Sequence, residues 1–333
     1  MRYPRGDRLL GPSRGPWAWT RMTVGAVILA VLVWRLGASP FLEPLRQLDA
    51  WSLVAAAGIA VPTTVCCAWR WRLVSQGLGS RLPLGAAIGA YYQSQFLNTV
   101  LPGGVLGDVR RAVRRGHEVG DFGCALRVLA WERTAGQFVQ VALTIVALLV
   151  LPSPIRSSMP VVAVAVVVAV LAAMVVARML PRRGPSVLAR TARALATDVR
   201  DGLLAARVWP GVVLASTVVV AGHATTFLIA ARAAGLTVSP TRLLPLILLV
   251  LLVTALPMSF AGWGPREGGA AWVFPLAGLG ADQGVATAVT YGVMVFVATL
   301  PGAAVMVAAW LRRNPVFHRG LPDTAAQEGV ARA

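Results

Sequence analysis

The sequence predicts an all-α, polytopic membrane protein, and three observations lead to this fold class. Hydrophobic residues make up 57% of the 333 positions and charged residues only 13%, a composition typical of membrane proteins rather than of soluble ones. The mean hydropathy is +0.69. Apolar stretches recur at the length of about 20 residues that a helix needs to cross a bilayer. We expect about six full transmembrane helices and two re-entrant hairpins.

The six expected spans are apolar segments separated by polar or arginine-rich stretches. They lie near residues 22–36, 50–69, 124–151, 160–180, 209–231 and 285–311. No small-residue cleavage pattern follows the first, so we interpret it as a retained helix rather than a signal peptide. Together the spans predict a transmembrane domain over 18–313, between a basic N-terminal tail (1–17) and a C-terminal tail (314–333) whose composition is typical of disorder. Residues 182–207 alternate apolar and basic positions, which favours an interfacial helix.

Arginine placement predicts how the chain is oriented. The chain has no lysine and a net charge of +18, and positively charged loops stay on the cytoplasmic side during insertion. Five arginines precede residue 22, and further arginines follow the second span (Arg70, Arg72, Arg81) and the last one. Both termini are therefore expected in the cytoplasm. Because the charge flanks apolar spans, we attribute it to the membrane rather than to nucleic acid.

Two more apolar stretches, 84–101 and 243–260, run into polar motifs that contain glycine. A full span at 84–101 would place Arg110 outside while Arg81 is inside, and a re-entrant hairpin removes the conflict. The same reasoning makes 243–278 a hairpin that enters and leaves from outside. Opposed broken segments are typical of transporters with inverted repeats and a site near the membrane midplane. The alternative is that proline and glycine merely kink two ordinary spans.

Small or helix-breaking residues are expected to form these hairpins, because a turn at membrane depth needs unusual backbone angles and close approach. They are Pro102, Gly103, Gly104, Gly107, Pro257, Gly262, Gly264 and Gly268. For Gly107 and Gly268, close helix packing is the alternative role.

Ionisable residues inside the apolar region are the candidate functional groups, since at membrane depth they normally face a cavity or a partner. The candidate substrate-binding residues, with one amide among them, are Asn98, Asp108, Arg111, Glu132, Arg133, Arg266 and Glu267. Arginine forks bind phosphate oxygens in paired hydrogen bonds, which predicts an anionic lipid headgroup as the ligand. A purely architectural role in ion pairs is the alternative.

Neighbouring residues on a helix point about 100° apart, so Glu132 and Arg133 are not expected to pair with each other. The same holds for Arg266 and Glu267. We therefore hypothesise a crossed arrangement in which Arg133 pairs with Glu267, and Arg266 pairs with Glu132 or Asp108.

Three blocks of the sequence resemble one known family. The stretch 95–111, which reads QFLNTVLPGGVLGDVRR, resembles the asparagine, proline-glycine, glycine-aspartate and arginine signature of the flippase-like family related to the lysylphosphatidylglycerol synthase transmembrane region. Glu132–Gly136 is similar to the family's acidic-Arg-x-x-Gly segment, with Glu where Asp is common. Residues 262–268 are similar to its Gly-x-Arg-Glu segment. The resemblance covers roughly 20–313, and it does not extend to the soluble synthase domain, so lipid aminoacylation is not implied.

The sequence thus favours a non-enzymatic flippase that moves an anionic phospholipid or polyprenyl-phosphate carrier between leaflets of the cytoplasmic membrane. No cofactor or metal is expected, because Cys66, Cys67 and Cys124 lack ligand spacing and no phosphate-binding Gly-Lys-Ser loop is present. One alternative is a membrane-embedded enzyme with Asp108 and Glu132 as acid and base. Another is a non-catalytic partner of an envelope-synthesis complex. Homo-oligomers and lipid-synthesis proteins are the partners left open.

Overall fold

The regular structure of the chain is helical. The computed structural model describes residues 16–101, 104–152, 197–198, 205–255, 259–260 and 262–313. Their helices are α1 (Pro16–Leu36), α2 (Ser39–Gln47), α3 (Ala50–Gly77), α4 (Leu84–Val100), α5 (Leu106–Val119), α6 (Phe122–Val150), α9 (Trp209–Ala233), α10 (Pro240–Thr254), α11 (Pro265–Leu276) and α12 (Ala281–Arg313). Within these ranges the one β feature is an isolated bridge between Phe260 and Trp263, so the all-α prediction is confirmed for them.

Some predictions fall outside the described residues. They are the span at 160–180, most of the interfacial helix at 182–207, nearly all of both tails, and the hairpin residues Pro102, Gly103 and Pro257.

Among the described residues, four helices are long and apolar enough to cross a membrane: α3, α6, α9 and α12. They match four of the six predicted spans, and the chain is accordingly a multi-pass membrane protein. Helix α3 is longer than predicted, because it continues eight residues past position 69 to Gly77. Arg70 and Arg72 therefore lie within α3 and not beyond it as predicted, and Arg70 is buried.

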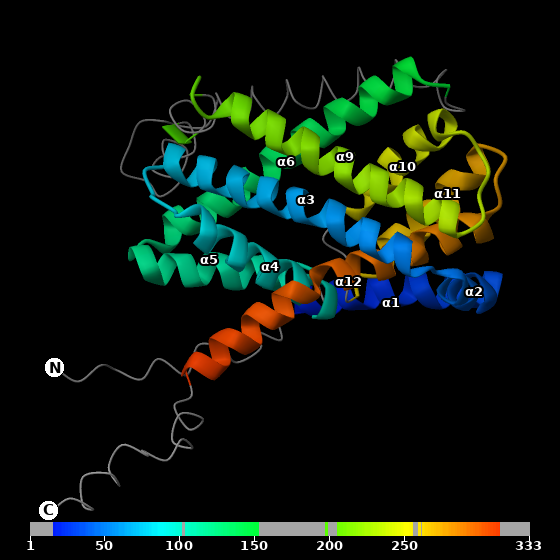
Figure 1. Cartoon of the computed structure of the whole chain (residues 1–333), viewed down its shortest axis with the longest axis horizontal. Coiled ribbons are helices and arrows are strands. Elements are labelled where there is room, and N and C mark those ends of the chain that lie inside the picture. Colours follow the sequence, from blue (N-terminus) through cyan, green and yellow to red (C-terminus); the bar gives the residue numbers. More distant parts are fainter. Residues whose placement is uncertain are drawn as a thin grey trace, which may run out of the picture.

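A pair of short helices lies between two long helices in the chain order, and this arrangement occurs twice. Helices α4 and α5 lie between α3 and α6, while α10 and α11 lie between α9 and α12. The packing corresponds as well, since α4 contacts α12 as α10 contacts α6, and α3 runs beside α9 (Figure 1). Helix α5 of the first pair contains four arginines, Arg110, Arg111, Arg114 and Arg115.

The helix pairs α4–α5 and α10–α11, which we call the first and second hairpins, approach each other at their ends. Gly104 has a φ of +63°, and a methyl group added to it would overlap the Ser259 hydroxyl of the other hairpin. Gly262 has a φ of +81°, and an added methyl group would lie 3.6 Å from the Cα atom of Thr99. Only glycine adopts such backbone angles without strain. Glycine therefore allows both the turns and the close approach of the two hairpin ends.

Apolar packing holds both hairpins in place. Phe227, Leu243 and Phe274 are fully buried in a cluster built from α9 to α12. A second cluster joins α3, α4 and α6 around Trp71 and Val74. Each hairpin therefore packs against a continuous apolar surface, which fixes the positions of the polar groups that it contains.

Candidate functional site

Glu132 of α6 is the centre of a buried ionic network. Its carboxylate Oε1 accepts hydrogen bonds from Arg70 Nη2 at 2.8 Å and from the Tyr91 hydroxyl at 2.8 Å. Its Oε2 accepts one from Arg111 Nη2 at 3.0 Å. Arg70 also donates to Ser216 of α9. Glu132 has no exposed surface, so the two guanidinium groups replace the water that would otherwise stabilise its charge.

Asp108, in the first turn of α5, forms the second part of the network. Its Oδ1 accepts from the Ser94 hydroxyl at 2.8 Å and from Arg111 Nη2 at 3.1 Å. Its Oδ2 accepts from the Asn98 amide at 2.9 Å and forms an ion pair with Arg133. Asn98 in turn accepts from the backbone N–H of Gly107 at 2.8 Å. The amide of Asn98 thus links the two arms of the hairpin.

Arg111 connects the two carboxylates and is held between aromatic rings. The carbon at the centre of its guanidinium lies 4.4 Å from the Trp71 ring centroid and 4.1 Å from that of Tyr91. These cation–π contacts fix the plane of the guanidinium group. Arg133 is different, because 44% of its side chain is exposed. It is the member of the network that is reachable from outside the helical body.

A separate pair lies in the second hairpin. Arg266 donates from Nε to Glu267 Oε1 at 2.9 Å, and Glu267 Oε2 accepts from the backbone N–H of Gly264 at 2.7 Å. Glu267 has no exposed surface. The Arg266 guanidinium faces the rings of Trp263 and Tyr291, with its central carbon 4.9 and 5.5 Å from their centroids.

The hypothesis of crossed ion pairs is wrong. Arg266 pairs with its sequence neighbour Glu267, Arg133 pairs with Asp108, and Glu132 pairs with Arg70 and Arg111. The geometric argument failed because residues in the first turn of a helix have no preceding turn to constrain them. The long Arg266 side chain can therefore fold back onto the carboxylate.

The two hairpins share one feature of chemistry. Asp108 is the third residue of α5 and Glu267 is the third residue of α11, and each is buried beside an arginine of its own helix. The positive end of the helix dipole stabilises a carboxylate in the first turn. The remaining hairpin glycines serve close packing: an added methyl group on Gly107 would overlap the Ser94 carbonyl oxygen, and one on Gly268 would lie 2.9 Å from Ile28.

Sequence reasoning missed Arg70, Tyr91 and Ser94, which complete the network. Tyr91 and Ser94 lie on α4, seven and four residues before Asn98 and thus on the same side of that helix. Arg70 directly follows the apolar stretch predicted at 50–69, within α3. Gly136 on α6 makes room for the Arg70 guanidinium. A methyl group added to Gly136 would lie 2.7 Å from a nitrogen of that guanidinium.

Comparison with known families gives one match over most of the chain. A family model described as the lysylphosphatidylglycerol synthase TM region matches residues 19–302, which include both hairpins and every candidate residue. Comparison with curated proteins gives no match.

Proposed function

This chain belongs to the lysylphosphatidylglycerol synthase transmembrane-region family, and on that premise we propose that it moves an anionic lipid, of phospholipid or polyprenyl-phosphate type, between membrane leaflets. The observation that carries the proposal is the ionic network buried behind the first hairpin. Ionisable groups inside a membrane domain are costly, and they commonly mark a substrate or ion pathway. The proposed substrate-binding residues are Asn98, Asp108, Arg111, Glu132, Arg133, Arg266 and Glu267.

Alternating access would follow from an inverted repeat. Two observations support such a repeat: the helix order and packing of α3–α6 correspond to those of α9–α12, and both hairpins place a buried carboxylate at the same helix position. Because the hairpin ends touch at Gly104 and Ser259, a small displacement of one hairpin relative to the other would open a path for a headgroup. The acyl chains would stay in lipid during this movement.

A vesicle assay tests translocation directly. The full chain is reconstituted into phosphatidylcholine vesicles that contain fluorescent phosphatidylglycerol, and a membrane-impermeant quencher reports how fast lipid changes leaflet. Asp108→Asn should slow translocation by about tenfold, because it weakens charge-assisted hydrogen bonds to Arg111 and Arg133 worth about 1.5–3 kcal/mol. Asp282→Asn is the control, since it makes the same chemical change at an exposed carboxylate of α12 that lies outside the ionic network. Wild-type vesicles that translocate no faster than empty ones refute the proposal.

The opposed, re-entrant arrangement is also part of the proposal and has its own test. Single cysteines at Ser80 and Ala277, in a background in which the three native cysteines are replaced by alanine, mark the bases of the first and second hairpins. We expect a membrane-impermeant maleimide to label Ser80→Cys from the cytoplasmic side and Ala277→Cys from the outside, with both termini cytoplasmic. Labelling of both positions from one side contradicts the inverted arrangement.

A further inference from the structure

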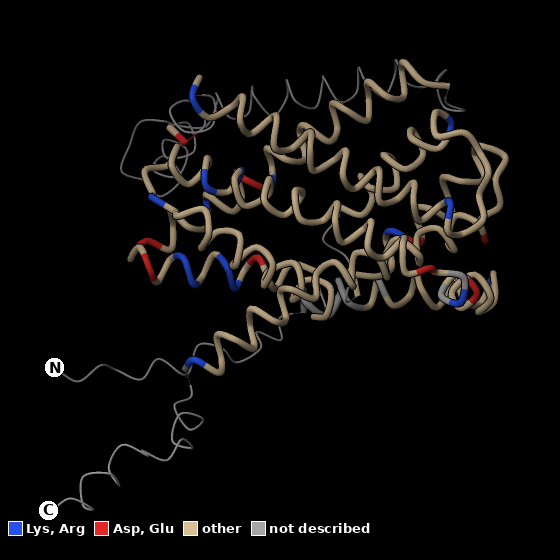
Figure 2. The backbone as a smooth tube through the Cα atoms, viewed as in Figure 1, with Lys and Arg blue, Asp and Glu red and all other residues tan. Residues whose placement is uncertain are grey.

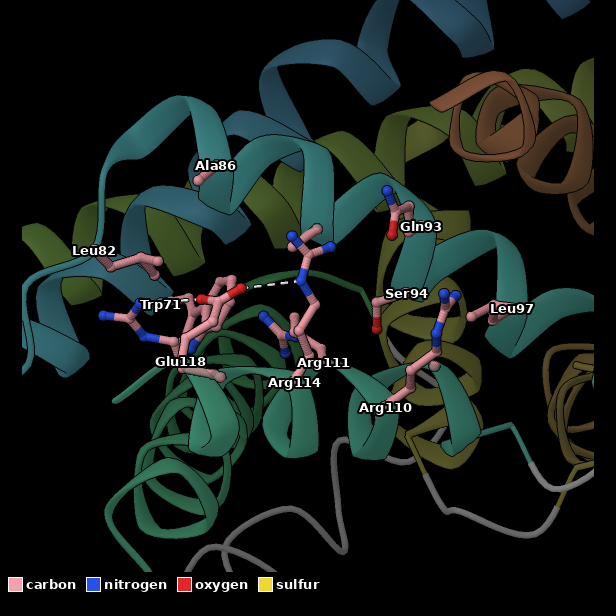
Figure 3. A pocket seen from close by; sticks show the side chains of 13 residues that line it. Trp71, Leu82, Ala86, Gln93, Ser94, Leu97, Arg110, Arg111, Arg114 and Glu118 are labelled. Atoms are coloured by element: carbon pink, nitrogen blue, oxygen red, sulfur yellow. Dashed lines mark hydrogen bonds and ion pairs between the residues drawn. The ribbon is translucent and has the colours of Figure 1, made fainter. Parts of the chain in front are cut away.

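An open groove lies between the two arms of the first hairpin, next to the ionic network. Its empty space amounts to about 470 Å³ with open solvent included, and the centres of water-sized spheres can occupy about 50 Å³ of it. In Figure 3, Ala86, Gln93, Ser94 and Leu97 line its α4 side, and arginines line its α5 side. The arginines that border it are Arg110, Arg111, Arg114 and Arg115. Figure 2 shows the same concentration of basic residues on α5.

Arg111 has donors that nothing in the described part of the chain uses. Its side chain is 2% exposed, and one nitrogen, Nη2, makes all of its bonds to Asp108 and Glu132. Among the described residues, Nε and Nη1 of Arg111 have no hydrogen-bond partner. A buried donor without a partner costs about 1–3 kcal/mol, so a ligand or a water that accepts from these nitrogens would stabilise the site.

The charges around the groove favour an anion. Four arginines border it, and among the described residues that line it the one acidic residue is Glu118, which accepts from Arg114 and Arg115. Gln93 and Ser94 add polar groups from the facing helix. A phosphate group offers several oxygens at once, and arginine donors match them in geometry and charge. The Trp71 and Tyr91 rings hold the Arg111 guanidinium in place before any ligand arrives.

We propose that this groove is a phosphate-binding site, in which Arg111 donates from Nε and Nη1 while its Nη2 stays bound to Asp108 and Glu132. The inference rests on the proposed function and deepens it, because it places the phosphate of the headgroup between α4 and α5 and names Arg111 as the proposed substrate-binding residue that contacts it. The phosphate group is the shared chemistry of a phospholipid headgroup and of free inorganic phosphate, and binding experiments separate these two sources.

The test uses the full chain purified in detergent. Native mass spectrometry measures retained phosphatidylglycerol against phosphatidylcholine, and a thermal melt measures the rise in Tm with inorganic phosphate against chloride at equal ionic strength. Arg111→Lys keeps the charge beside Asp108 and Glu132 but loses the fixed planar donors. Ala86→Trp fills the groove mouth without touching the ionic network. Ala55→Trp is the matched control, because Ala55 is exposed on α3 and does not line the groove.

We expect Arg111→Lys and Ala86→Trp to lower binding by about tenfold, the loss of roughly one charge-assisted hydrogen bond, while Ala55→Trp behaves as wild type. A loss confined to phosphatidylglycerol assigns the site to a lipid headgroup, and a loss confined to the phosphate-dependent Tm rise assigns it to free phosphate. Equal behaviour of all four proteins in both experiments overturns the proposal. Groove-dependent binding without translocation refutes the flippase alone, whereas translocation without groove-dependent binding refutes the site alone.

Discussion

Glu132→Gln should destabilise the protein more than any other single substitution in the ionic network. The change removes one negative charge from a position with no exposed surface and leaves Arg70 and Arg111 facing a neutral amide. Removing one partner of a buried ion pair typically costs about 3–5 kcal/mol, because the remaining charge stays buried without compensation. Tyr91 would keep an acceptor in the glutamine carbonyl, so the loss reports mainly on charge.

The measurement is the midpoint of thermal unfolding in detergent, followed by size-exclusion chromatography. Glu118→Gln is the control: it also removes an acidic partner of two arginines, but 45% of its side chain is exposed, and exposed pairs contribute about 1 kcal/mol or less. In the double variant Arg70→Gln, Glu132→Gln, the loss should be smaller than the sum of the single losses, since each removes the other's partner. Equal melting of Glu132→Gln and Glu118→Gln would show that the network does not stabilise the fold.

The sequence identified Glu132 as a candidate functional residue, but it did not identify its partner Arg70. A carboxylate in an apolar stretch must have a counter-charge, and that reasoning identified the residue. The partner, Arg70, lies 62 positions away in the chain, and its position near the end of an apolar stretch is typical of a loop flank. Local patterns specify helices, whereas pairings between distant helices depend on how the helices pack, which no local pattern encodes.

For the two hairpins as well, the sequence predicted the local segments but not the contacts between side chains. Arginine placement and the glycine motifs predicted interrupted segments at both places, and the structure has paired short helices there. The sequence identified Arg111 as a candidate binding residue from its type and position, but it did not predict its surroundings. In the structure Trp71, Tyr91 and two carboxylates surround the Arg111 guanidinium, a set of contacts that depends on how α3, α4, α5 and α6 pack. The pairing of Arg266 with Glu267 escaped prediction for a local reason, the conformational freedom of side chains at a helix start.

Gly107→Ala should separate the two arms of the first hairpin and disrupt the site. A methyl group on Gly107 would overlap the backbone carbonyl oxygen of Ser94 and lie 2.8 Å from the Asn98 side-chain oxygen. The carbonyl belongs to α4 and cannot move by itself, so α5 must shift away. Asp108 follows in the chain and would lose its bonds to Ser94 and Asn98. Overpacking of this kind typically costs about 1–3 kcal/mol.

Gly89→Ala is the matched control, because Gly89 lies on α4 with no atom within 4 Å of an added methyl group. Alanine is favoured over glycine inside a helix by about 0.5–1 kcal/mol, so this variant should melt at the wild-type temperature or above it. Gly107→Ala should melt lower and also translocate lipid more slowly than Gly89→Ala in the vesicle assay, since the displaced Asp108 no longer holds Arg111 and Arg133. If the two variants have equal melting temperatures and translocation rates, close contact of the arms at Gly107 is not what positions Asp108.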